Sequence, residues 1–364
     1  MKRGICIVVW CLAFYIAGRF KAEAILATVL ASAIVGMVLL ITVIYQAFAV
    51  KIDLKMERDF GKKETSLSGK IFLENRSFLP ISKFLVCLEY FYEPYGKKEV
   101  QKIPGVLDGR GTIEIPFSIQ PMYSGTLNII IYNIKVWDIL GIFCKKRKIG
   151  KESKITIFPF GKVMKIKEDR LKSEVFSIQE NEQNILPGNN PPDVFQIHPY
   201  QQGEPLRTVH WKLTARLDEI MSRQYAEDMQ ILPVLYLQRA KAEGMNVKLV
   251  DAYWEVAVAL SRGLLEADIP HQVVWNDQME HFHRMEIYGE KDFLFTWKMA
   301  ITYSCELEEK RVDFVYKQLK KENTASIPII CVNQYLVVLR DGEEIIRFSL
   351  DHYSEEMEKR WVSV

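Results

Sequence analysis

The chain has 364 residues and is close to neutral, with 48 Lys and Arg against 46 Asp and Glu and a formal net charge of +2. This balance lacks the basic excess with which nucleic-acid-binding domains contact phosphates, so no nucleic-acid partner is expected. The length suits about two or three domains, and 49% hydrophobic residues are enough for folded cores.

The cysteines indicate a reducing compartment. They occur singly, without a CxxC pair or a metal-ligand spacing, at Cys6, Cys11, Cys87, Cys144, Cys305 and Cys331. This pattern predicts neither a disulfide scaffold nor a zinc cluster. No cofactor is predicted from any other motif of the chain.

Residues 1–50 contain two uncharged apolar runs, 4–18 and 24–50, separated by the charged segment RFKAE. The second run exceeds the roughly 20 residues that a helix needs to cross a bilayer. The two runs together predict a transmembrane hairpin of two helices. A cleaved signal peptide is the alternative for the first run, because Lys2 and Arg3 precede its apolar core.

The flanking charges predict the orientation of this hairpin, because Lys and Arg are enriched on the cytoplasmic side. Only Arg19 and Lys21 lie between the two runs, whereas several cations follow the second run. These are Lys51, Lys55, Arg58, Lys62 and Lys63. We therefore expect a two-pass protein of the inner or plasma membrane with its globular domains in the cytoplasm.

Residues 51–160 contain short alternating apolar runs separated by turn residues, which predict a small antiparallel β-sandwich. The runs are 66–73, 83–90, 111–119 and 126–136. The basic segment 145–148 (KKRK) is interpreted as a solvated loop, with contact to anionic lipid headgroups as the alternative.

Residues 161–197 are polar and include a Pro- and Gly-rich stretch, which predicts a linker. In residues 198–364, apolar runs alternate with helical segments, and Asp341-Gly342 predicts a hairpin turn. The runs are 231–237, 272–275 and 327–332, and the helical segments are 250–267, 293–303 and 311–321. This alternation predicts a doubly wound, largely parallel α/β sheet.

The segment 198–228 has an unusual composition. Arg207, Trp211 and Ala215 recur at a spacing of four residues, and Lys212 and Arg216 form a second such pair, so each set shares one face of a helix. Structural ion pairs around a docked Trp211 are the favoured interpretation. An anion-binding or partner-binding site is the alternative.

This segment also resembles the signature of the bacterial domain-of-unknown-function family fifty-eight. The matching residues are Tyr200, Gly203, Arg207, His210, Trp211, Lys212, Ala215, Arg216, Arg223, Gln224 and Tyr225. Two positions depart from the signature: Gln202 replaces a proline, and Glu204 replaces an aspartate that would cap the helix better. The likeness extends over essentially the whole chain, including Asn75-Arg76-Ser77 and residues 137–143 (WDILGIF).

The resemblance implies a carboxy-terminal domain similar to von Willebrand factor type A, in a membrane protein often encoded beside MoxR-type AAA+ ATPases. Domains of that type often bind magnesium through Asp-x-Ser-x-Ser after the first strand. The equivalent stretch here is Gln238-Arg239-Ala240, which supplies no such ligand. We therefore expect the metal site to be lost.

Other chemistry-bearing motifs are weak. His281 and His283, with His271 near in sequence, are a possible start of a metal site, but no third ligand is assigned. The sequence has no Walker loop, GxGxxG or GxSxG. We therefore expect a non-enzymatic, membrane-anchored adaptor that contacts the lipid bilayer and a protein partner, with a MoxR-type AAA+ ATPase as first candidate. The alternative is a membrane-bound enzyme of cell-envelope metabolism with its site around Arg207 and His210.

Overall fold

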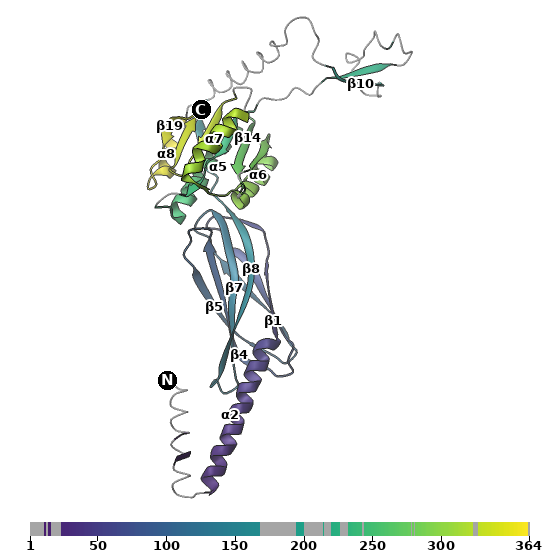
Figure 1. Ribbon diagram of the computed structural model, residues 1–364, viewed down its shortest axis with the longest axis vertical. Coiled ribbons are helices and arrows are strands. Elements are labelled where there is room, and N and C mark those ends of the chain that lie inside the picture. The colour runs from purple at the N-terminus through teal and green to yellow at the C-terminus, as the bar shows by residue number, and fades with distance from the viewer. Residues whose placement is uncertain are drawn as a thin grey trace. The chain divides into compact units, whose positions relative to one another are not determined.

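A computed structural model describes residues 11, 14–15, 23–167, 194–199, 214, 220–225, 232–241, 244–277, 279, 281–322 and 327–362 (Figure 1). The chain divides into two compact units. We call Met1–Phe160 together with Gly244–Glu255 the β unit. We call Gly161–Glu243 together with Val256–Val364 the α/β unit.

One long apolar helix, α2 (Glu23–Ala49), precedes the first strand. Its segment Ala27–Ala49 is long and apolar enough to cross a membrane, and it is the only such helix among the described residues. A helix of this kind near the amino terminus is a membrane anchor or a signal sequence. The predicted two-helix hairpin is wrong, and the structure does not support a two-pass topology. Of the first predicted span, only positions 11, 14 and 15 are among the described residues.

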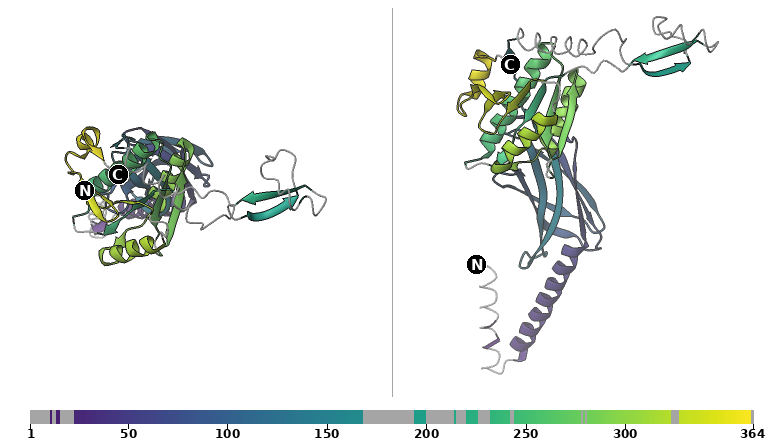
Figure 2. Two further views of the ribbon diagram at one scale, coloured as in Figure 1. Left: turned by 90° about the horizontal axis from the view of Figure 1, so that it is seen from above. Right: turned by 45° about the horizontal axis from the view of Figure 1, so that its top comes forward.

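Helix α2 continues directly into strand β1 (Val50–Met56), with no residue between them (Figure 2). One face of its last turns is buried, with Val43 and Ala47 1% and 0% exposed. The side-chain amide of Gln46 donates a hydrogen bond to the carbonyl oxygen of Pro80 at 2.9 Å. The carboxyl end of the helix is therefore part of the β unit.

The β unit contains two sheets around one apolar core. The first has the order β1-β3-β6, with β3 (Leu67–Asn75) and β6 (Thr112–Ile119). The second has the order β2-β8-β7-β4-β5, with β2 (Phe60–Lys62), β4 (Ile81–Tyr92), β5 (Glu99–Leu107), β7 (Gly125–Trp137) and β8 (Cys144–Phe158). All pairings are antiparallel except that of β2 with β8.

The basic segment 145–148 is not a loop. It belongs to β8, where Lys145, Arg147 and Lys148 face Val136, Ile134 and Asn133 of β7. The loop prediction failed because charge was taken as a sign of missing secondary structure, whereas an edge of a sheet accepts long cationic side chains that reach solvent.

The α/β unit contains a six-stranded sheet of order β15-β14-β12-β17-β18-β19. Its strands are β12 (Val234–Leu237), β14 (His271–Asn276), β15 (Phe282–Ile287), β17 (Ile329–Val332), β18 (Val337–Arg340) and β19 (Glu343–Arg347). The pairings of β12 with β14 and with β17 are parallel, and the pairings β14–β15, β17–β18 and β18–β19 are antiparallel.

The predicted doubly wound sheet of the von Willebrand factor type A kind is therefore wrong. The connections 277–281, 333–336 and 341–342 are too short for the crossovers of a dozen or more residues that parallel neighbours need. They return the chain as hairpins, so three of the five strand pairings are antiparallel.

Helix α7 (Glu309–Glu322) packs on one face of this sheet, where Val312, Val315 and Leu319 join the cluster that contains Tyr236 and Val274. The other helices are α5 (Val247–Glu266), α6 (Glu290–Tyr303) and α8 (Tyr353–Lys359). Three short pairings complete the described elements: β9 (Lys165–Ile166) with β20 (Trp361–Val362), β13 (Ala240–Lys241) with β16 (Leu307–Glu308), and β10 (Val194–Pro199) with β11 (Met221–Tyr225).

Candidate functional site

The motif that carries the family resemblance lies almost entirely outside the described residues. This applies to Tyr200, Gly203, Glu204, Arg207, His210, Trp211, Lys212, Ala215 and Arg216. The backbone of Arg223 is in β11, opposite Ile197 of β10, while its side chain is outside the described part. The structural and partner-binding interpretations of the motif both stay predictions.

Arg239 follows β12, where the resemblance would place a metal ion. Its guanidinium lies 2.8 Å from a carboxylate oxygen of Glu306 and donates hydrogen bonds to the carbonyl and hydroxyl oxygens of Ser304 at 3.2 and 3.0 Å. Both side chains of the ion pair are buried. The two charges balance each other, and the contacts tie the end of β12 to the segment that follows α6.

Ser261, His271 and Trp297 form a buried hydrogen-bonded chain in the α/β unit. The Ser261 hydroxyl lies 2.6 Å from His271 Nε2 and accepts a hydrogen bond from Trp297 Nε1 at 3.1 Å. His271 Nδ1 lies 3.1 Å from the carbonyl oxygen of Ile269, which fixes Nδ1 as the protonated nitrogen and Nε2 as the acceptor. All three side chains are almost completely buried. This serine-histidine pair therefore joins α5, α6 and β14 and is closed to a substrate.

The histidines of the predicted weak metal site are separated. His281 and His283 both approach Asp277, at 3.6 and 3.1 Å, on the surface. His271 pairs with Ile287 at the other end of the β14–β15 hairpin, about 13 Å along the strand from Trp275, which faces His283. Within the described part of the chain, no group of three His, Cys, Asp or Glu side chains is placed to hold a metal.

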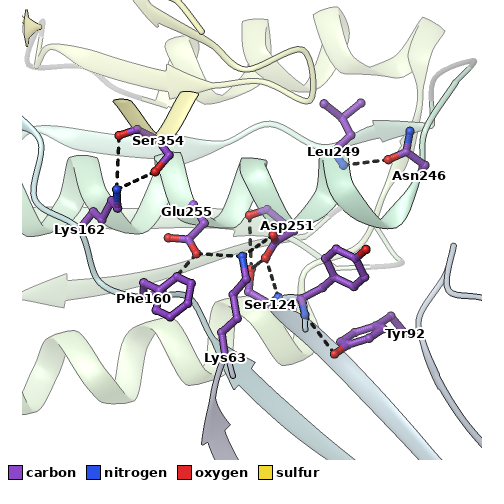
Figure 3. A network of polar contacts seen from close by, with 11 residues as sticks. Lys63, Tyr92, Ser124, Phe160, Lys162, Asn246, Leu249, Asp251, Glu255 and Ser354 are labelled. Atoms are coloured by element: carbon purple, nitrogen blue, oxygen red, sulfur yellow. Dashed lines mark hydrogen bonds and ion pairs between the residues drawn. The ribbon is translucent and has the colours of Figure 1, made fainter. Parts of the chain in front are cut away.

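The most heavily charged buried group lies in the β unit, at the start of α5 (Figure 3). Asn246 begins this helix, because its side-chain oxygen accepts a hydrogen bond from the Leu249 amide at 3.0 Å. One turn later, Asp251 and Glu255 lie four residues apart and therefore on the same helix face. Both carboxylates are buried.

Lys63, in the turn after β2, reaches both carboxylates. Its ammonium lies 2.6 Å from Asp251 Oδ2 and 3.4 Å from Glu255 Oε1, and 5.1 Å from the centre of the Phe160 ring. The Lys63 side chain is 9% exposed. One buried cation thus faces two buried acids.

Both carboxylates also accept main-chain or hydroxyl donors, Asp251 at its other oxygen and Glu255 at the oxygen that faces Lys63. The Ser124 amide and hydroxyl both donate to Asp251 Oδ1 at 2.7 Å, and the Phe160 amide donates to Glu255 Oε1 at 3.3 Å. Gly125, at a φ of 121° that favours glycine, turns the chain from Ser124 into β7. We call Lys63, Ser124, Asp251, Glu255 and the Phe160 amide the Lys63 cluster.

The electrostatics of the Lys63 cluster leave one acid in excess. Burial raises the pKa of Glu255, while Lys63 and the Phe160 amide oppose this rise. A single ammonium cannot balance two ionised carboxylates. Of the two acids, Asp251 lies closer to the ammonium and has the shorter hydrogen bonds from its donors. The Ser124 hydroxyl donates to Asp251 and is buried with it, so the chemistry of the cluster is that of a buried structural ion network.

Glu255 should give the stability of the protein a characteristic pH dependence. A raised pKa means that the folded state holds the proton at pH values where the unfolded state has lost it, so the contribution is complete below the ordinary value of 4.5 and disappears as the pH rises through the folded value. Glu255→Gln should remove this part of the slope. Urea unfolding of both proteins between pH 4 and 8 measures it, and equal slopes would contradict the assignment.

The sequence contained a signal for this cluster that was not used. Lys63 was considered only as a flanking charge of the membrane segment, and Asp251 and Glu255 lie in the predicted helix 250–267, which is otherwise almost entirely apolar. Two acids one turn apart in such a helix require a buried partner. Tyr253 and Trp254 of the same helix are buried in the core.

Comparison with known proteins gives no family. No family model and no curated protein matches the chain. Solved structures that align with it include a CARDB domain from Pyrococcus furiosus (12% identity, 30% of this chain and 91% of that chain, TM-score 0.22). Others are the alkylpurine DNA glycosylase AlkC of Pseudomonas fluorescens (16% identity, 30% of each chain, TM-score 0.24) and the sporulation control protein Spo0M of Bacillus subtilis (11% identity, 42% and 58%, TM-score 0.20). Similarities at these TM-scores carry no argument about fold or function.

Proposed function

We propose that the chain is a membrane-anchored, non-enzymatic interaction protein. The observation that supports this most is the junction between α2 and the β unit. Ala47 of α2 belongs to the apolar core of the β unit, and Gln46 is hydrogen-bonded to Pro80. Cleavage of α2 as a signal sequence would take these residues out of a folded core. Retention of the helix as a single anchor is therefore favoured.

The orientation follows from the charges around this single helix. Within about 15 residues of the segment Ala27–Ala49, the cations before it are Arg19 and Lys21, and those after it are Lys51, Lys55, Arg58, Lys62 and Lys63; Lys2 and Arg3 lie farther away. Because Lys and Arg are enriched on the cytoplasmic side, we place both units in the cytoplasm, at the inner or plasma membrane.

The proposed partner is a protein, with a MoxR-type AAA+ ATPase as first candidate on the basis of the sequence resemblance. The anchor supports such a role physically, because it holds both units near one surface and raises the local concentration for weak contacts. The enzyme alternative gains no support from the Ser261–His271 pair, which is closed to substrates. Because a buried ion pair of Arg239 and Glu306 occupies the end of β12, partner binding is expected to survive a chelator.

Co-purification tests this proposal. Full-length protein extracted from membranes should retain the ATPase, with and without chelator, and should change its turnover. Arg207→Glu, in the family motif, should weaken retention and its salt dependence, whereas the same charge change at Lys317, exposed on α7, should not. Absence of retention and of any change in turnover at several salt concentrations would reject the adaptor role in favour of the envelope enzyme.

A further inference from the structure

We propose that a basic groove at the carboxyl end of α2 binds the phosphate of an anionic phospholipid headgroup. The groove has a volume of about 380 Å³ and is lined by residues 48–52, Arg76, residues 147–149 and Lys151. All of these belong to the β unit. The inference rests on the proposed role of α2 as a membrane anchor and adds a ligand class to it.

The lining is cationic and contains no acid. Its charged residues are Lys51, Arg76, Arg147, Lys148 and Lys151. Two of them have exposed carboxylate neighbours outside the lining: Glu74 lies 3.4 Å from Arg76, and Asp53 lies 3.5 Å from Lys151. Among the described residues, Lys51, Arg147 and Lys148 have no carboxylate within ion-pair distance. The groove therefore keeps a positive charge that an anion can neutralise.

Arg147 fixes the floor of the groove. Its guanidinium donates to the carbonyl oxygens of Phe48, at 2.9 Å, and Val50. These oxygens are at the carboxyl end of α2, where the helix dipole is negative and a cation is stabilising. Arg147 thus compensates the end of the helix, and Lys51 and Lys148 remain at the rim, exposed to solvent, for a ligand.

The position of the groove selects the source of the phosphate. The membrane-spanning segment Ala27–Ala49 ends on two residues that line the groove, Phe48 and Ala49. Tyr45 and Phe48 are exposed on the helix, as aromatic residues at a bilayer interface are. A groove at this level faces headgroups, and its apolar wall of Phe48 and Ala49 suits the glycerol and first acyl carbons. Basic clusters directly beside a transmembrane helix on the cytoplasmic side are typical of anionic lipid recognition.

The test uses the full-length protein in nanodiscs of phosphatidylcholine with a minor share of phosphatidylglycerol. After mild detergent extraction, the ratio of the two lipids that stay bound is measured by native mass spectrometry. Wild-type protein should retain phosphatidylglycerol above its share in the nanodisc, by about fivefold for each rim lysine at low salt. Lys51→Gln with Lys148→Gln should return the ratio to that share, and the matched pair Lys70→Gln with Lys102→Gln, on exposed strand positions outside the groove, should not.

Three outcomes would overturn the assignment. Equal retention by the groove variant and wild type would show that the groove does not select the lipid. Displacement of the lipid by millimolar inorganic phosphate would make free phosphate the ligand. Alkaline carbonate extraction of the cell membranes that contain the protein tests the membrane anchor separately from the lipid site. Release of the protein would reject the anchor and the lipid site together, whereas an integral protein without lipid enrichment would reject the lipid site alone.

Discussion

Replacing Lys63 with methionine is expected to lower the free energy of unfolding by about 3–5 kcal/mol, the usual cost of removing one partner from a buried ion pair. Methionine fills a similar volume, so the packing around Phe160 changes little. Asp251 keeps the two donors of Ser124 and Glu255 keeps the Phe160 amide, but their charges lose the ammonium. Denaturant unfolding of the full-length protein in detergent micelles at neutral pH measures the loss.

The cost should shrink as the pH falls, because Glu255 escapes its lost partner by taking up a proton. Lys70→Met is the matched control. Lys70 also pairs with a carboxylate, Glu114, at 3.1 Å, but both side chains are about half exposed, so its removal should cost less than about 1 kcal/mol. Equal losses for the two variants would show that the Lys63 cluster is solvated and has no special role in stability.

The local elements could be predicted from apolar periodicity. The runs 66–73, 83–90, 111–119 and 126–136 correspond to strands β3, β4, β6 and β7, because alternating positions face the common core. The helical segment 250–267 corresponds to α5, and Asp341-Gly342 forms the turn between β18 and β19. These features depend on neighbours in sequence, which is the information that a periodic pattern contains.

Strand direction and the fate of the first apolar residues could not be predicted in the same way. Parallel and antiparallel strands have similar apolar runs, and only the length of a connection distinguishes them. The connection 333–336 between β17 and β18 is too short for a crossover, and its length was not used in the prediction. The prediction of a transmembrane hairpin failed for a related reason: the apolar residues give the length of a run but do not show which segment it packs against.

In the candidate sites, too, the charged residues could be found in the sequence, but their distant partners could not. Arg239 was singled out in the sequence as a charge after the first strand of the sheet, but the carboxylate that it contacts, Glu306, lies 67 residues away in the sequence. The Lys63 cluster joins residues separated by 188 and 192 positions. In the sequence, each member of such a long-range pair shows only as a charge in an apolar segment, and its counterion cannot be identified.

Acidification should destabilise the α/β unit through His271, by about 3 kcal/mol between pH 7 and pH 4. Burial lowers the pKa of this imidazole from 6.5 to about 4, and the hydrogen bond to Ile269 opposes the shift only in part. Below pH 6.5 the His271 imidazole binds a proton in the unfolded chain, whereas in the folded protein it stays neutral until the pH approaches 4. The stabilising contribution is therefore complete above 6.5 and is lost as the pH falls toward the folded value.

His271→Gln should flatten the acid limb of the stability profile, because glutamine keeps a polar contact for Ser261 but does not titrate. His283→Gln should leave the limb unchanged, since His283 is half exposed beside Asp277. Should the glutamine variant fail to fold, the imidazole resonances of wild-type protein give an independent measurement. A folded-state titration of His271 near pH 6.5 would contradict the closed Ser261–His271–Trp297 chain, because an imidazole that protonates at its ordinary value must have access to water, and Nε2 would then be free to act as a base toward a substrate.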